Sequence, residues 1–177
     1  MRFKIDIMSK GECILFSSKD LKDDCIIVSI NDTNFDTVIS ENKRIIDIHK
    51  VWFDDIENAI NPKLKLMTID QAEGVKDFVD KYKNKVDNIK IHCTAGISRS
   101  GAVGCVIARY LNNDDNYIWA TGRYLPNKHV YKTMCEAFNL EYSDKLFEYK
   151  TKLKEGNLKF CNDYGVNIND MFCDVII

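Results

Sequence analysis

The residues best suited to chemistry lie in one short run, HCTAGISRS, at positions 92–100. Cys93 ends a predicted strand and Arg99 opens a predicted helix, with five residues between them. Backbone N–H groups in such a turn can converge on an anion, and the helix adds about half a positive charge at its N-terminus. Gly96 can adopt the positive φ of a tight loop, and Arg99 can bind two oxygens of a tetrahedral dianion. The run therefore predicts a loop that binds a phosphoryl group.

The same features predict that Cys93 is a nucleophile. A nest of N–H groups, a helix N-terminus and a guanidinium all stabilise a thiolate, which is the reactive form of cysteine. A free cysteine is more often a small buried apolar residue, and this is our interpretation of Cys105 and Cys135. The strand before Cys93 and the helix after it favour the reactive role for this position.

The run resembles the HCxxGxxR(S/T) signature of the cysteine-based protein tyrosine phosphatase superfamily, and it is most similar to the loops of dual-specificity phosphatases. The resemblance implies that Cys93 is the nucleophile and that Ser100 helps the thiolate leave. It also implies that His92 orients the loop by hydrogen bonding. The implied phosphate-binding residues are Thr94, Ala95, Gly96, Ile97, Ser98 and Arg99.

A second stretch of the chain resembles the family's RPxxxPN sequence. Arg123, Pro126 and Asn127 stand in the corresponding places, and in the family the asparagine braces the phosphate loop. A Pro-Asn pair by itself marks only a turn or a helix start. Both interpretations of Asn127 stay open at this point.

The departing oxygen of a phosphate ester needs a proton, and in this superfamily an aspartate upstream of the cysteine supplies it. Asp54 and Asp55 directly follow the apolar run 51–53. We expect Asp55 to be the acid, with Asp54 as the alternative, although Asp55 lies farther upstream of Cys93 than is usual in dual-specificity phosphatases. A third interpretation is that both are solvated loop charges. Asp70 is expected to cap or open the helix that follows.

The resemblance implies hydrolysis of a phosphate ester through a phosphocysteine, with no cofactor and no metal. Residues 94–98 carry no charge, whereas phosphoinositide phosphatases of the superfamily tend to carry lysines there. We therefore predict a protein phosphatase of the dual-specificity type, with phosphotyrosine as the better substrate. The alternatives are a phosphate- or phosphopeptide-binding module with weak catalysis, a phosphoinositide or RNA 5′-phosphate phosphatase, and a Cys-x₅-Arg sulfurtransferase.

The composition of the chain excludes several classes of partner and location for this chemistry. The 177 residues carry 25 Lys and Arg against 27 Asp and Glu, a balance that argues against a nucleic-acid or polybasic membrane partner. No apolar run approaches the ~20 residues that cross a bilayer. Seven scattered cysteines, without a CxxC pair, do not suggest a disulfide framework or a zinc site. We expect a cytoplasmic protein whose partner is a phosphorylated protein substrate.

The elements that must position the loop follow from the apolar pattern. Apolar runs predict strands at 3–7, 13–16, 25–30, 45–53 and 89–92. Helical spacing predicts helices at 75–86, from Arg99 to a stop at Asn112 and Asn113, and at 115–121, 128–139 and 141–154. This order predicts a single α/β domain over residues 1–177, with a central, largely parallel sheet flanked by helices. In such sheets ligands bind at the carboxyl ends of strands, which is where HCTAGISRS falls.

Overall fold

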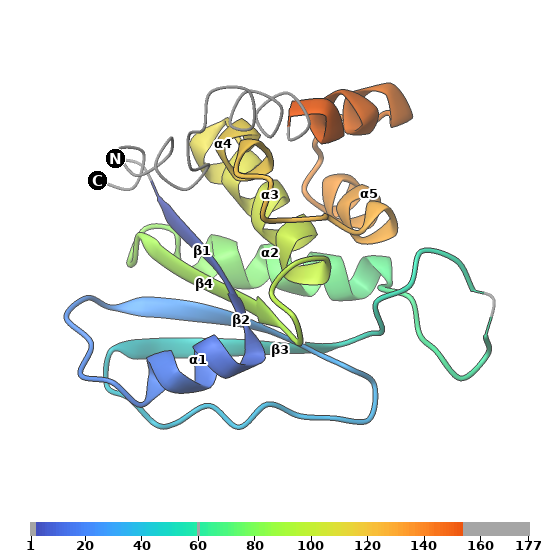
Figure 1. Cartoon of the computed structure of the whole chain (residues 1–177). Helices are drawn as coiled ribbons and strands as arrows, with labels where there is room; N and C mark the ends of the chain where they lie inside the picture. Colours follow the sequence, from blue (N-terminus) through green and yellow to red (C-terminus); the bar gives the residue numbers. More distant parts are fainter. Residues whose placement is uncertain (1–2, 60, 154–177) are drawn as a thin grey trace, which may run out of the picture.

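The computed structural model describes residues 3–59 and 61–153, which form a four-stranded sheet with helices on both faces (Figure 1). The strands run in the order β1-β4-β2-β3, and each neighbouring pair is parallel. Their bounds are Lys4–Ser9 for β1, Cys25–Asn31 for β2, Ile45–Trp52 for β3 and Asn88–Cys93 for β4. The predicted α/β class with a central parallel sheet is confirmed.

The two crossover connections that contain a helix place α1 and α2 on opposite faces of this sheet. The chain crosses from β1 to β2 in one direction and from β3 to β4 in the other, so right-handed connections put α1 and α2 on different sides, as Figure 1 shows. Helix α3 packs against β1 and β4 on the α2 side of the sheet, and α5 packs against α2 and α3. The helix bounds are Lys10–Ser17 for α1, Ile69–Tyr82 for α2, Arg99–Asn112 for α3, Asn116–Ala120 for α4 and Lys128–Ala137 for α5, and a further helix spans 144–153.

The predicted strand at 13–16 is wrong, because these residues lie in α1. Ser9 caps this helix: its hydroxyl accepts a hydrogen bond from the Glu12 N–H, and the Glu12 carboxylate accepts one from the Ser9 N–H. This capping box starts a helix directly after β1. The buried Cys13 and Ser17 lie four positions apart on one face of the helix.

The helix predicted at 75–86 begins earlier and ends earlier than its apolar stripe. Thr68 and Gln71 form a capping box that starts α2, so Asp70 lies in the first turn and is not the cap. The stripe itself is buried as expected, with Val75, Phe78, Val79 and Tyr82 facing the core. Val86 is also buried but lies beyond the last helical residue.

A continuous core joins the sheet to α3 and α5. All seven residues of β2 are buried, which is the burial expected of an interior strand covered on both faces. Helix α3 is buried from Arg99 to Ala108, and Asn113 ends it with a φ of 57°, as the Asn112–Asn113 pair predicted. Over the described ranges, no helix combines the length and the apolar character needed to span a bilayer.

Candidate phosphate-binding site

The run HCTAGISRS lies where β4 ends and α3 begins, at the carboxyl edge of the sheet. Gly96 holds the loop against the end of β1, with a φ of 73° that favours glycine. A Cβ at this position would lie 2.4 Å from the Ser9 nitrogen and 2.6 Å from the Met8 carbonyl carbon. Both the backbone conformation and the close approach to β1 therefore require glycine here.

The Cys93 sulfur lies in this loop with two polar partners. The Gly96 N–H donates to Sγ at 3.3 Å, and the Ser100 hydroxyl lies 3.1 Å from the same atom. Donors of this kind stabilise a thiolate. Cys93 is buried, as are the other described cysteines. Burial raises the pKa of Cys13 to about 12 and that of Cys135 to about 11. Those thiols are core residues, as the sequence suggested for Cys135.

Arg99 is the buried cation of the site, with 3% of its surface exposed. Its Nη1 donates to the Phe53 carbonyl at 2.8 Å, which fixes one end of the guanidinium. Its Nη2 donates to Thr94 Oγ1 at 3.2 Å and to Asp32 Oδ1 at 2.7 Å. Its Nε is buried and has no hydrogen-bond partner among the described residues. Because a buried unpaired donor is costly, an anion oxygen at Nε would be stabilised.

The two adjacent aspartates after β3 have different surroundings. Asp55 lies beside the loop, where its Oδ1 accepts from Ser98 Oγ at 2.7 Å and from Asn127 Nδ2 at 2.9 Å. Its Oδ2 lies 3.9 Å from Arg99 Nε. The structure therefore brings together Asp55, the loop and Arg99.

Asp54 instead connects two loops. Its carboxylate accepts hydrogen bonds from the hydroxyl and N–H of Thr33 and, at 2.8 Å, from the Lys65 N–H. Burial raises the pKa of Asp54, but these hydrogen bonds and the charge of Arg99 outweigh burial and hold the pKa below its usual value. These hydrogen bonds hold two loops together, and none of them reaches residues 93–99.

Asn127 makes one contact that caps a helix and others that reach the loop and Asp55. Its Oδ1 accepts from the Val130 N–H at 3.0 Å and so caps α5. Its backbone N–H donates to the Ser98 carbonyl at 3.3 Å, next to the Asp55 contact of its side chain. Arg123 does not join this group, because it pairs with Glu12 at 3.1 Å.

His92 lies directly beneath the loop and is fully buried. Its Nε2 is 2.8 Å from Ser29 Oγ, which links β4 to β2. Burial lowers the pKa of His92 to about 4, so the ring is neutral at physiological pH. The contact with Ser29 suits the orienting position that was expected of this residue.

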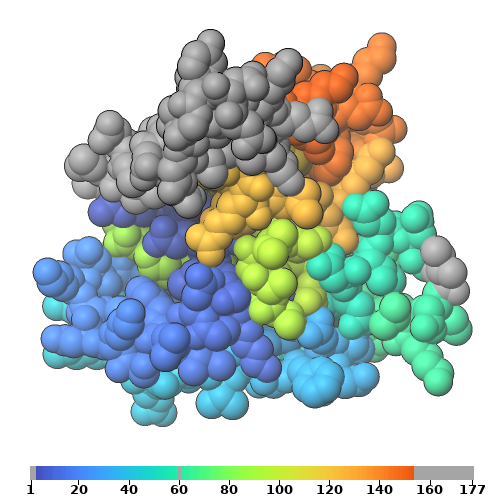
Figure 2. All heavy atoms as spheres, viewed as in Figure 1, coloured from blue at the N-terminus to red at the C-terminus, as the bar shows by residue number. Residues whose placement is uncertain are grey.

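The mouth of the site is formed by segments far apart in the sequence. In Figure 2 the loop, in yellow-green, reaches the surface between the segments that follow β1, β2 and β3 and the segment before α5. Of the remaining loop residues, Thr94, Ala95 and Ile97 are exposed. Hydrogen bonds from Lys10 N to Thr94 O and from Leu125 N to Ile97 O join the loop to two of these segments.

Sequence reasoning missed Asp32. This residue follows β2, and its carboxylate contacts both Arg99 and Thr94, with Thr94 Oγ1 donating to Oδ2 at 2.8 Å. Asp32 is the first residue after a buried strand, and polar residues at that place are the ones that meet at the carboxyl edge of a parallel sheet. That signal was available, but it becomes specific only once β2 is known to lie beside β4.

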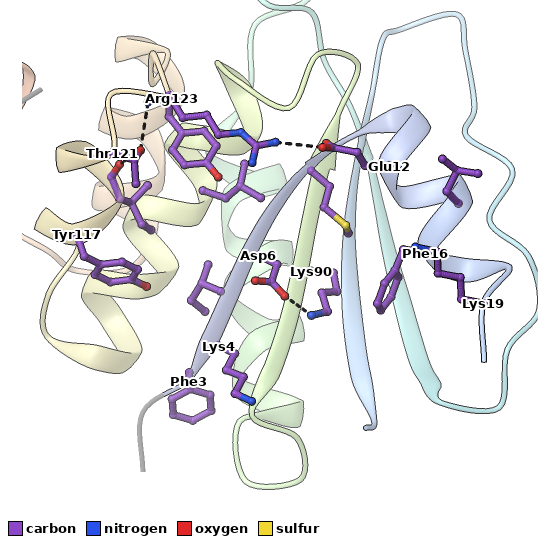
Figure 3. Close-up of a pocket in the computed structure, with 16 residues that line it drawn as sticks. Phe3, Lys4, Asp6, Glu12, Phe16, Lys19, Lys90, Tyr117, Thr121 and Arg123 are labelled. Carbon is purple, nitrogen blue, oxygen red and sulfur yellow. Dashed lines mark hydrogen bonds and ion pairs between the residues drawn. The ribbon is translucent and has the colours of Figure 1, made fainter. Parts of the chain in front are cut away.

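A separate hollow of about 590 Å³ lies along the edge strand β1. Figure 3 shows Asp6 and Lys90 paired across it and Glu12 paired with Arg123 at one end. None of the described loop residues 93–99 lines this hollow. Within residues 3–59 and 61–153, no group of three or more His, Cys, Asp or Glu side chains is arranged to hold a metal ion.

Comparison with known proteins adds little to this geometry. No family model matches the chain, and no curated protein matches it. Among solved structures it is similar to "Crystal structure of Tk-PTP in the active form", with a TM-score of 0.40 and 15% sequence identity over 85% of this chain and 90% of that chain. A similarity this low carries no argument about family or activity, so the function must be argued from the loop and its neighbours.

Proposed function

We propose that this chain is a phosphoric monoester hydrolase of the protein tyrosine phosphatase type, acting on phosphorylated proteins through a phosphocysteine. One observation carries the proposal. The sulfur of Cys93 accepts a hydrogen bond from the Gly96 N–H and lies beside the Ser100 hydroxyl, at the loop where Arg99 holds a buried N–H with no hydrogen-bond partner among the described residues. A nucleophile and an anion-binding donor within one short loop are the parts that phosphoryl transfer requires.

The first chemical step follows from these positions. The Cys93 thiolate attacks phosphorus in line, a sulfur–phosphorus bond forms, and the bond from phosphorus to the leaving oxygen breaks. Asp55 gives its proton to that oxygen, a contribution that is typically worth ~10²–10⁴-fold. Arg99 and the loop N–H groups stabilise the charge on the other three phosphoryl oxygens.

The second step releases phosphate. Asp55, now a carboxylate, takes a proton from the attacking water while the water oxygen bonds to phosphorus. The sulfur–phosphorus bond breaks, and the electron pair returns to Cys93. The Ser100 hydroxyl, 3.1 Å from Sγ, stabilises the departing thiolate by donating a hydrogen bond.

The substrate class follows from the mouth of the site. Thr94, Ala95 and Ile97 face solvent and carry no positive charge to meet additional phosphates of an inositol ring. Ile97, with 38% of its surface exposed, offers apolar contact to a phenyl ring. These features support phosphotyrosine as the better substrate, with phosphoserine and phosphothreonine accepted. The five described cysteines are all free, which supports the reducing cytoplasm as the location.

The test compares turnover of phosphotyrosine, phosphoserine and phosphothreonine peptides, a phosphoinositide and an RNA 5′-phosphate. Phosphotyrosine should be hydrolysed fastest, and Cys93→Ser should abolish hydrolysis. The matched control is Cys13→Ser, a buried thiol in α1 that should leave turnover unchanged. Tight phosphopeptide binding without turnover would instead indicate a binding module, and cyanide-dependent thiocyanate release would indicate a sulfurtransferase.

The acid is tested by a pair of adjacent variants. Asp55→Asn should lower kcat for a phenyl phosphate by about 10²-fold or more, because no proton reaches the leaving oxygen. Asp54→Asn should leave kcat within a few-fold of the wild type and lower the unfolding midpoint, because it weakens the contacts with Thr33 and Lys65. The reverse pattern would move the acid to Asp54.

A further inference from the structure

We propose that Asp32 occupies the Nη2 nitrogen of Arg99 in the free protein, competes with phosphate for it and is displaced by the phosphoryl group. This inference rests on the proposed function and adds a residue to it. Asp32 sets how tightly an anion binds at the loop, because each bound phosphoryl group must first remove a carboxylate from the same guanidinium.

The contacts of Asp32 form a closed set with Arg99 and Thr94. Oδ1 of Asp32 lies 2.7 Å from Arg99 Nη2, and Oδ2 accepts from Thr94 Oγ1 at 2.8 Å. Thr94 Oγ1 in turn accepts from Arg99 Nη2 at 3.2 Å. Both oxygens of the Asp32 carboxylate are therefore engaged, one by the arginine and one by the neighbouring hydroxyl. An oxyanion ligand would contact the same two groups.

The edge of the guanidinium that faces Asp32 is the edge suited to phosphate. Nη1 is already committed to the Phe53 carbonyl, so Nε and Nη2 remain for two oxygens of a ligand. Nε is buried without a hydrogen bond among the described residues, and Nη2 contacts both Asp32 and Thr94. Asp32 and Thr94 are both bonded to Nη2, so a phosphoryl group that binds both nitrogens must replace one of these partners, and it repels the like-charged Asp32.

The charges of the site also indicate that Asp32 must leave when phosphate binds. Arg99 is the cation at the centre of the site, while Asp32, Asp55, the Cys93 thiolate and a phosphate dianion are all acidic. Asp55 must carry a proton to act as the acid, so the carboxylate that must leave when the dianion enters is Asp32. Like charges this close disfavour joint occupancy.

Asp32 has solvent beside it into which its side chain can move. Asp32 lies in the connection that follows β2, at the first position of a turn closed by the Phe35 N–H, and 37% of its side chain is exposed. Rotation of its side chain into solvent replaces the lost contacts with water.

The experiment measures inorganic phosphate binding and the hydrolysis of para-nitrophenyl phosphate. Asp32→Asn should tighten phosphate inhibition and lower KM by about tenfold, while kcat stays within about twofold. The effect is limited to about this size because Asp32 is a third exposed and solvent screens its charge. A lower KM with unchanged kcat is the signature of ground-state competition, which a loss of structure would not produce.

Three variants complete the design. Asp36→Asn is the matched control, since it removes the same charge from the same loop but from a pair with Lys50, and it should leave KM unchanged. Asp32→Glu retains the charge and should keep KM near the wild-type value. If Asp32→Asn does not fold, Asp32→Ser suits the same turn position and serves the same comparison.

The outcomes separate this inference from the proposed function. If the wild type hydrolyses the ester but Asp32→Asn binds phosphate as weakly as the wild type, or more weakly, Asp32 does not compete and the inference is overturned. If no form hydrolyses the ester or binds phosphate, the proposed function fails and the inference fails with it.

Discussion

Replacing Gly96 by alanine tests whether the activity depends on the conformation of the loop. The position combines a φ of 73° with direct contact between the loop and the end of β1. An alanine Cβ would lie 2.4 Å from the Ser9 nitrogen and 2.6 Å from the Met8 carbonyl carbon. These neighbours are backbone atoms of a strand, so they cannot rotate away as a side chain would. Either the loop or the end of β1 must shift.

The size of the effect follows from two terms. A left-handed conformation costs an alanine about 1–2 kcal/mol, and overpacking of this kind costs about 1–3 kcal/mol. Together they predict a loss of about 2–5 kcal/mol in the free energy of unfolding, a large share of the 5–15 kcal/mol that is typical of a domain. The shift also moves the Gly96 N–H away from Cys93 Sγ, now 3.3 Å distant. Loss of one such donor predicts a fall in kcat of about 10²-fold.

The assay pairs urea unfolding with hydrolysis of para-nitrophenyl phosphate. Gly11→Ala is the matched control, because Gly11 lies in α1 and no described atom would approach its Cβ within 4 Å. That change should stabilise the protein by about 0.5–1 kcal/mol through helix propensity and leave kcat unchanged. A Gly96→Ala protein with wild-type stability and turnover would refute the reasoning, because the loop would then tolerate the position being filled.

Three further outcomes are expected from the core. Burial holds the pKa of His92 near 4 in the folded protein, whereas the unfolded chain protonates this residue below pH 6.5. The free energy of unfolding should therefore fall by about 3 kcal/mol between pH 6.5 and pH 4. Urea unfolding at several pH values should show a smaller fall in His92→Gln. Gly104→Ala should destabilise the protein by about 1–3 kcal/mol, because its Cβ would lie 2.6 Å from Ile7 Cδ1. Adding Ile7→Ala should recover part of the loss. Additive effects of the two changes in a double-mutant cycle would contradict this contact. Lys150→Met should cost about 3 kcal/mol, since it leaves the buried Asp115 carboxylate without its cation; an unchanged thermal midpoint would argue against the pair.

Much of the fold near the loop could be predicted from local sequence. Residues 88–112 read as strand, loop and helix because the apolar runs are continuous and because Asn113 ends the helix in a left-handed conformation. The strand predicted at 13–16 was wrong for an equally local reason: the capping box of Ser9 and Glu12 outweighs four apolar residues in a row. Both results depend on interactions within a few positions of the chain.

Asp32 could not be predicted in the same way, because its partner Thr94 is distant in sequence and the two meet only through sheet order. Parallel pairing of β2 with β4 brings their carboxyl ends together, and that pairing depends on the chain returning from β3 past β2 to form β4. The apolar pattern identifies each strand but does not say which strands are neighbours. At the edge of a parallel sheet, the sequence therefore predicts only those site residues that follow the strand with the motif.

The choice between Asp54 and Asp55 has the same origin. The two residues share a type and a place in the sequence, directly after β3, but the chain bends at Asp55 and their side chains meet different partners. Asp54 meets Thr33 and Lys65, whereas Asp55 meets Ser98 and Asn127. Partners supplied by α5 and by the loop before α3 thus distinguish them, and spacing from Cys93 carries no such information. The three carboxylates have different partners, so we expect their variants to change different quantities. Variants of Asp32 should change KM, those of Asp54 should change stability, and those of Asp55 should change kcat.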